Sequence, residues 1–393
     1  MKLLALFIQP AQFRNQDPDS SRKVTWAELF YDLVFVTAIA ALAEYFFTHF
    51  SLTGLVQTIM LFATMWYAWL SATFYADRFD TDDAWHRVMN VFQMLCVVGI
   101  AVNIHTAFHL HSYLFIVFYV ALRSSIVLLY VRVARQLRTR RSAILPIILL
   151  MLVILGLWCI SLLVAPPWRY AVWLLAIAID IALPLVLRHR LSATTLPLSH
   201  DHLPERFGLF TMIVLGESLA SIVHGLLDIG TTFTSLLMAL MVLLISFSIW
   251  WLYYDNVDDA AMKRPFSAVL CWEYLHFVLL ICIMMLSVTI RHIFEVTAAE
   301  LTMEHVLLPS LLVVIYAILG LFNYLCYRYE NVPTVACRYL ICARLIAVGM
   351  GIVGVWLGFY LSLLWLVVFM TVLSVAQVLH NIILPEDEFT VLK

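Results

Sequence analysis

The chain has 393 residues, of which 64% are hydrophobic and only 12% are charged, and its mean hydropathy is +0.97. This composition excludes a soluble globular domain, whose surface needs many more polar residues. The formal net charge is −2, and the basic residues do not form the pattern of a nucleic-acid-binding surface. We therefore expect an all-α protein embedded in membrane lipid, with no nucleic-acid partner.

Twelve predicted membrane-spanning helices follow a cytoplasmic N-terminal arm, residues 1–23. The apolar run in this arm is too short for the core of a signal peptide. A spanning helix needs about 20 mostly apolar residues. Windows of that kind lie at residues 25–49, 52–76, 87–109, 112–131, 143–165, 168–188, 205–225, 232–254, 267–291, 304–327, 334–356 and 359–383.

The positions of the basic residues predict the orientation of these helices. If the N-terminus is cytoplasmic, the inner segments hold 19 of the 23 Lys and Arg residues, and the outer loops hold only Arg169 and Arg291. Basic residues collect on the cytoplasmic side of a membrane. The chain is therefore predicted to be a multi-pass protein of the cell inner membrane with both termini in the cytoplasm.

The two halves of the chain are similar in sequence, which predicts an internal repeat. Glu28-Leu29-Phe30 matches Glu205-Arg206-Phe207 at an offset of 177 residues, and residues 75–80 align with residues 253–258 at an offset of 178. We expect two parallel six-helix repeats, residues 24–190 and 205–384. A cytoplasmic linker, residues 191–204, would join them, and residues 385–393 would form a cytoplasmic tail.

Cysteine and the large aromatic residues are predicted to have structural roles. The seven cysteines form no Cys-x-x-Cys pair, so we expect no disulfide, no metal site and no cofactor. The 12 Trp and 17 Tyr residues suit the belts at the two membrane surfaces, and none is assigned to a binding site.

Acidic residues near the start of the first helix are candidate functional groups. Glu28 and Asp32 lie four residues apart and share a helix face. Two carboxylates at that spacing repel one another unless a cation lies between them. Glu28 also suits a helix N-terminus, where an acid can cap the first turn. Both interpretations are open for Glu28, whereas the deeper Asp32 favours a functional role.

A polar stripe runs along the seventh helix. Arg206, Glu217 and His224 lie within about 20° of one line at 100° per residue. A carboxylate this far into a membrane helix must be neutral, paired or hydrated. We expect Glu217 and His224 to line an interior pathway together with Glu205 and Arg206 at the helix start.

Two arginines and two further polar groups lie inside other predicted helices. Arg123 and Arg344 are near the bilayer centre, so each is expected to meet a carboxylate. Glu273 and His276 are three residues apart in the ninth helix and are weaker candidates for the pathway.

One face of the third predicted helix is also polar. His86, Asn90 and Gln93 recur along it at helical spacing. This face is a weaker signal than the acids of the first helix and the stripe of the seventh.

Residues 23–36 (KVTWAELFYDLVFV) and 205–218 (ERFGLFTMIVLGES) resemble the two signatures of the bacterial low temperature requirement A family. The resemblance implies a bacterial inner-membrane protein named for growth in the cold, without an agreed biochemical activity. It maps the acids of the family motifs onto Glu28, Asp32, Glu205 and Glu217. Tyr31 stands where the family pattern would have Phe.

The leading hypothesis is a transporter or channel that moves a cation, a proton or a small solute past the carboxylates of the first and seventh helices. Membrane lipids are the other expected partners, and the oligomeric state is open. An intramembrane enzyme acting on lipid-linked substrates is the alternative, but Gly-x-Ser-x-Gly and His-Glu-x-x-His motifs are absent from the sequence. A non-transporting membrane scaffold remains if the buried charges only pair with one another.

Overall fold

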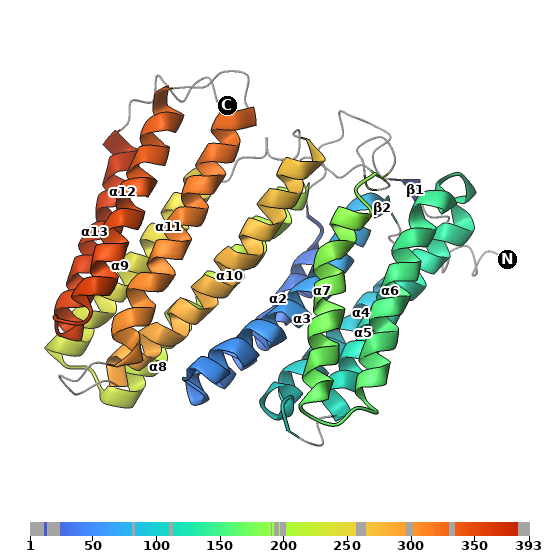
Figure 1. Cartoon of the computed structure of the whole chain (residues 1–393), viewed down its shortest axis with the longest axis horizontal. Helices are drawn as coiled ribbons and strands as arrows, with labels where there is room; N and C mark the ends of the chain where they lie inside the picture. Colours follow the sequence, from blue (N-terminus) through green and yellow to red (C-terminus); the bar gives the residue numbers. More distant parts are fainter. Residues whose placement is uncertain are drawn as a thin grey trace. The chain divides into compact units, whose positions relative to one another are not determined.

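In a computed structural model of the chain, the described residues form helices apart from one two-residue strand pairing and the connecting loops (Figure 1). The structure describes residues 12–13, 24–80, 83–109, 113–189, 191, 196, 202–256, 265–295, 302–329 and 335–383. Its elements are β1 (Gln12–Phe13), α2 (Trp26–Thr48), α3 (Leu52–Arg78), β2 (Phe79–Asp80), α4 (Ala84–Asn103), η1 (Ile104–Thr106), α5 (Tyr113–Gln136), η2 (Arg138–Arg140), α6 (Arg141–Ser161), α7 (Trp168–Val186), α8 (His202–Ile229), α9 (Phe233–Asn256), α10 (Phe266–Glu295), α11 (Met303–Tyr329), α12 (Val335–Leu357) and α13 (Leu363–Ile383).

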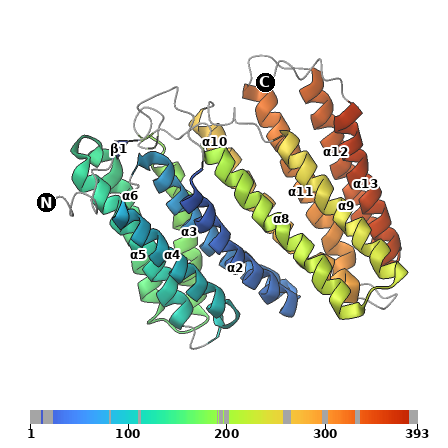
Figure 2. The ribbon, with the colours of Figure 1, turned by 180° about the vertical axis from the view of Figure 1, so that it is seen from behind.

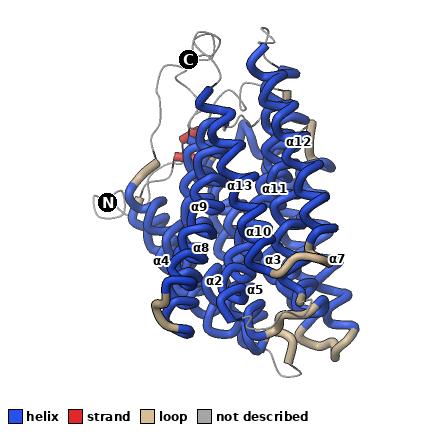
Figure 3. Tube along the Cα trace, turned by 90° about the vertical axis from the view of Figure 1, so that its left-hand side faces the viewer, coloured by secondary structure: helices blue, strands red, loops and turns tan. Residues whose placement is uncertain are grey.

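The described residues contain twelve α-helices that are each long and apolar enough to span a membrane. This finding confirms the predicted fold class and places each predicted span on one helix. Helix accounts for nearly all of the described trace (Figure 3), as a lipid environment requires, because a helix satisfies its own backbone hydrogen bonds. The chain is a multi-pass membrane protein.

Side-chain caps fix where several helices begin. Ser51 precedes α3, and its hydroxyl accepts a hydrogen bond from the Gly54 amide at 3.1 Å. Asp83 does the same for α4, accepting from the His86 amide at 2.9 Å. These caps satisfy amides that have no partner within the first turn. The start of α4, which carries the polar face of His86, is therefore set locally.

The described helices fall into two compact units. The first contains α2 up to Tyr45, then α3 to α7 and the first turns of α8 up to Leu209. Within this unit α4 packs on α5, α5 on α6, and α6 on α7, and Figure 2 shows α4 beside α5. Its polar residues form the site described below.

The second unit contains Phe46–Phe50 and the chain from Phe210 onward. Here α11 packs on both α10 and α12, and α13 packs on α9 and α12. Glycine permits the close approach of α12 to α11, since a Cβ on Gly351 would lie 2.5 Å from Cγ2 of Val313. The relation of the two units as sequence repeats stays a prediction.

Candidate functional site

A capping box starts α2 and positions Glu28. The carboxylate of Glu28 accepts hydrogen bonds from the Thr25 amide at 2.9 Å and the Thr25 hydroxyl at 2.8 Å. In return, the Glu28 amide donates to the Thr25 hydroxyl at 3.3 Å. The pattern Thr-x-x-Glu satisfies two amides of the first turn reciprocally. Glu28 therefore has the capping role considered for it, and its second oxygen is left for other contacts.

Asp32 lies one turn deeper on α2 and forms a buried ion pair with Arg206 of α8. Nε of Arg206 donates to Oδ2 of Asp32 at 3.1 Å, and a second guanidinium nitrogen donates to Oδ1. The side chains are 1% and 2% exposed, so the pair is fully inside the protein. The cation expected near the two acids of the first helix is thus Arg206, which approaches from a helix far away in the sequence.

Trp69 of α3 completes the binding of Asp32. Its indole N–H donates to Oδ1 at 2.7 Å, and its ring lies 5.7 Å from the guanidinium carbon of Arg206. The tryptophans were predicted to suit the membrane-surface belts and none was assigned to a binding site, but Trp69 is fully buried. A tryptophan can donate one hydrogen bond while its ring packs in an apolar interior.

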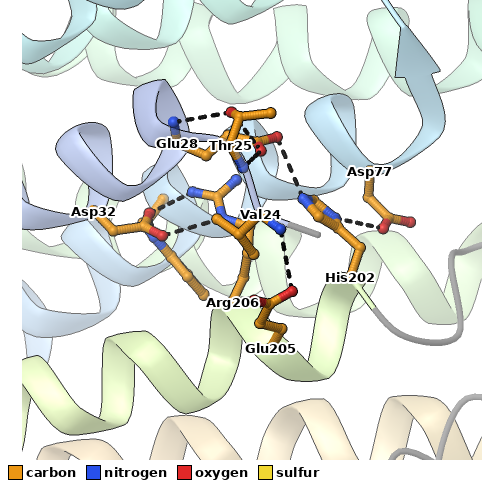
Figure 4. A network of polar contacts seen from close by, with 9 residues as sticks. Val24, Thr25, Glu28, Asp32, Asp77, His202, Glu205 and Arg206 are labelled. Carbon is orange, nitrogen blue, oxygen red and sulfur yellow. Dashed lines mark hydrogen bonds and ion pairs between the residues drawn. The ribbon is translucent and has the colours of Figure 1, made fainter. Parts of the chain in front are cut away.

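His202 connects Glu28 to an acid on α3. Its Nδ1 lies 3.0 Å from Oδ1 of Asp77, and its Nε2 lies 3.3 Å from Oε1 of Glu28 (Figure 4). Neither His202 nor Asp77 was predicted as a site residue. His202 was predicted to lie in the linker, whereas α8 begins at His202. Pro204 fits there because a proline needs no amide partner in the first turn of a helix. The spacing of four residues between His202 and Arg206, which share a helix face, was the available signal.

Glu205 lies beside this network and is exposed. Its carboxylate accepts a hydrogen bond from the Val24 amide at 3.1 Å, which ties the start of α8 to the residues before α2. We call Glu28, Asp32, Asp77, His202 and Arg206 the charged network. Glu205 is its link to the chain entering α2.

A small cavity of about 20 Å³, with room for about one water molecule, adjoins the charged network. Glu28 and Arg206 line it from one side. Three polar residues of α4 also line the cavity: His86, Asn90 and Gln93. The polar face predicted for this helix therefore borders the same cavity as the charged network. Tyr31 of α2 also contributes to the wall.

Two of the groups that line the cavity are buried without a protein partner. Among the described residues, the hydroxyl of Tyr31 and Nε2 of Gln93 make no hydrogen bond. Their side chains are 4% and 1% exposed. Buried polar groups are almost always satisfied by protein or by ordered water. The cavity is therefore the place where a water molecule or a small polar ligand would complete their hydrogen bonds.

The predicted stripe along α8 is not uniform in the structure. Arg206 is buried, Glu217 is half-buried and His224 is exposed. The charged network includes Arg206 but neither of the other two, which lie further along the helix. Their place in a pathway stays a prediction.

The two arginines inside predicted helices have different kinds of partner. Arg123 forms a buried ion pair with Asp180 at 2.6 Å, as expected. Arg344 instead donates to the amide oxygens of Gln377 at 2.6 Å and Asn381 at 2.8 Å. The prediction of a hydrogen-bonded carboxylate for Arg344 is therefore wrong within the described residues. Two amide oxygens at i, i+4 on α13 accept the hydrogen bonds of the guanidinium, and the charge of Asp255 also acts on it.

Glu273 and His276 are buried in α10. Nδ1 of His276 lies 2.8 Å from the Trp272 carbonyl, and its Nε2 lies 3.0 Å from the hydroxyl of Tyr253. The carbonyl can only accept, so Nδ1 carries the proton and Nε2 accepts from tyrosine. His276 is thus held as a hydrogen-bonded residue of the helix interior.

The fold and this site define a class: a helical membrane protein with charged side chains bonded to one another inside its spans. The match to Bacterial low temperature requirement A protein (LtrA) over residues 23–378 shows that the chain belongs to that family. It is also 27% identical over 258 residues to the uncharacterised protein RA0937 of Rhizobium meliloti (strain 1021). That alignment covers 64% of this chain and 63% of the relative.

Proposed function

We propose that this protein is a transport protein of the cell inner membrane, with both termini in the cytoplasm, and that the charged network forms part of its pathway. The observation that carries the proposal is the cavity lined by Glu28 and Arg206 together with the polar face of α4. A small cation, a proton or a small polar solute is the class of permeant that such a site suits.

The energetics of buried charge support this proposal. An ionisable group inside a membrane span costs about 2.5–3.5 kcal/mol on insertion scales. A well-packed apolar pair is often as stable as a buried ion pair, or more stable. A network of three acids, one arginine and one histidine beside a polar cavity is therefore a costly way to hold helices together. It is a reasonable way to receive a charged or polar permeant.

We propose no enzymatic activity for the chain. The alternative, an intramembrane enzyme acting on lipid-linked substrates, would require a nucleophile with an adjacent base or a metal centre. The charged network contains acids, an arginine and a histidine, and each of them is bonded to another member of the network. This arrangement favours binding and transfer of an ion over covalent chemistry.

Glu28→Gln tests the proposed function. Glutamine also suits the last position of a capping box, so α2 should still form, while the carboxylate at the cavity is removed. We expect purified protein in liposomes to lose at least about tenfold of its flux, measured with a panel of protons, sodium and potassium. Normal flux at unchanged protein content would contradict the assignment of Glu28 to the pathway.

Glu44→Gln is the matched control for this experiment. It makes the same chemical change on the same helix, but Glu44 lies near the opposite end of α2 from the capping box. We expect this variant to transport at the wild-type rate. A loss of flux in both variants would mean that any loss of charge on α2 disables the protein, and Glu28 would have no special role.

A further inference from the structure

His202 lies between two carboxylates, and each of its ring nitrogens faces one of them. Nδ1 faces Oδ1 of Asp77 at 3.0 Å, and Nε2 faces Oε1 of Glu28 at 3.3 Å. A neutral imidazole carries one N–H, and its other nitrogen presents a lone pair. That lone pair would face a carboxylate oxygen unless one of the two acids were protonated. The arrangement is therefore satisfied when Glu28, His202 and Asp77 together hold one extra proton.

The charges of the network also favour an added proton. Arg206 is bonded to Asp32 in a pair with no net charge. Glu28 and Asp77 then remain with His202 between them. Charges in a low-dielectric interior are stable only when they are compensated, so two carboxylates favour an added positive charge on the ring. One proton reduces this imbalance without any movement of the helices.

The cavity offers that proton a route. Glu28 contacts His202 and is itself one of the residues that line the cavity. The unsatisfied atoms in the wall are the hydroxyl of Tyr31 and Nε2 of Gln93, both buried. Water bonded to these atoms would stand beside the Glu28 carboxylate. The groups needed to hydrate an acid inside a membrane span are thus already in place.

We propose that His202 binds and releases one proton, which it exchanges with water in the cavity through Glu28, and that this proton is the ion that the protein transports or couples to transport. The proposal rests on the proposed function. In the binding step, a hydrated proton adds to Oε1 of Glu28. It then passes to Nε2 of His202, which leaves a carboxylate and an imidazolium, while Nδ1–H donates to Asp77. Release reverses these steps, and no electron is transferred.

Other titratable and charged groups lie near this relay and bear on its pH dependence. They come from five helices: Tyr31 and Asp32 on α2, Arg78 on α3, His86 on α4, Tyr130 on α5 and Arg206 on α8. Among these, only His86 carries an imidazole, as His202 does. A His86→Gln variant therefore belongs in the same experiment.

The test is the rate of proton entry into liposomes that contain an internal pH dye, driven by an imposed membrane potential. Rates are measured from about pH 5 to pH 8, the range in which imidazole changes charge. We expect His202→Gln to reduce the rate at least about tenfold. We expect Asp77→Asn to move the pH midpoint of the rate toward lower pH, because one acid beside the imidazolium has been neutralised. His105→Gln, in η1, is the control and should behave as wild type.

The outcomes separate the relay from the proposed function. Wild-type proton entry in folded His202→Gln protein would overturn the relay. An unchanged pH midpoint in Asp77→Asn would also overturn it. Because asparagine keeps the shape of the aspartate side chain, this variant tests the relay even if His202→Gln cannot be purified. If His86→Gln abolishes the pH dependence instead, the proton-binding residue is His86. If wild-type protein moves sodium or potassium but no protons, and its rate does not depend on pH, the proton relay is wrong and the proposed transport function still holds. Wild-type protein that moves no ion at all would overturn the relay and would exclude protons, sodium and potassium as permeants in the proposed function.

Discussion

Replacing Arg206 by leucine is expected to lower the free energy of unfolding by about 3–5 kcal/mol, because Asp32 would then keep a buried charge without its ion-pair partner. Both side chains are fully buried. Trp69 alone would remain to donate a hydrogen bond to the carboxylate. Thermal or denaturant unfolding of the purified protein in detergent measures the change.

Two further variants serve as controls for this measurement. Arg188→Leu changes an exposed arginine beyond the end of α7 and should alter stability by less than about 0.5 kcal/mol. The double variant Asp32→Leu/Arg206→Leu removes both charges and should recover most of the lost stability. We expect the double variant to fold without transporting. If it folds and transports normally, the pair only holds helices together.

Replacing Arg123 by leucine is expected to lower the free energy of unfolding by a similar amount, about 3–5 kcal/mol, for the same reason. Its partner Asp180 is 5% exposed and lies on α7 at 2.6 Å. The functional outcome should differ. This pair does not line the cavity, so Arg123→Leu/Asp180→Leu should regain both stability and flux. Liposome transport beside the unfolding measurement checks this, and a folded double variant without flux would place the pair in the pathway.

Much of the fold could be predicted from the sequence, because lipid imposes strong constraints on each helix separately. A span needs length and hydropathy, and both can be read from about 20 consecutive residues. The start of α2 was similarly readable, since Thr25 and Glu28 form their capping box within four residues. The paired acids Glu28 and Asp32 were identified for the same reason, from their spacing on one helix.

The partners of these acids could not be predicted, because they come from distant parts of the chain. Asp32 and Arg206 are 174 residues apart. His202 and Asp77 are 125 residues apart. Helical spacing says which side chains share a face but not which other helix that face meets. A tryptophan such as Trp69 gives no signal of its own, since its ring suits both a membrane-surface belt and a buried site.

Arg344 illustrates a further limit. Its position inside a span correctly predicted that it needs partners, because an isolated guanidinium in a membrane is too costly. That cost does not determine whether the partners are charged or neutral. Amide oxygens of Gln377 and Asn381 accept its hydrogen bonds as a carboxylate would. A requirement for hydrogen bonds is not a requirement for opposite charge.

The central claim is that the charged network meets water in a cavity, and the reactivity of a cysteine at Asn90 tests it most directly. Asn90 lines the cavity, whereas its neighbour Val91 is an apolar residue outside the cavity whose side chain is 54% exposed. In a background without the native cysteines, each position is changed to cysteine and treated in membrane vesicles with a membrane-impermeant thiol reagent. We predict rapid labelling of Asn90→Cys from the cytoplasmic side and little labelling of Val91→Cys. Equal labelling of the two, or none at Asn90→Cys, would contradict a water-filled site beside Glu28 and Arg206.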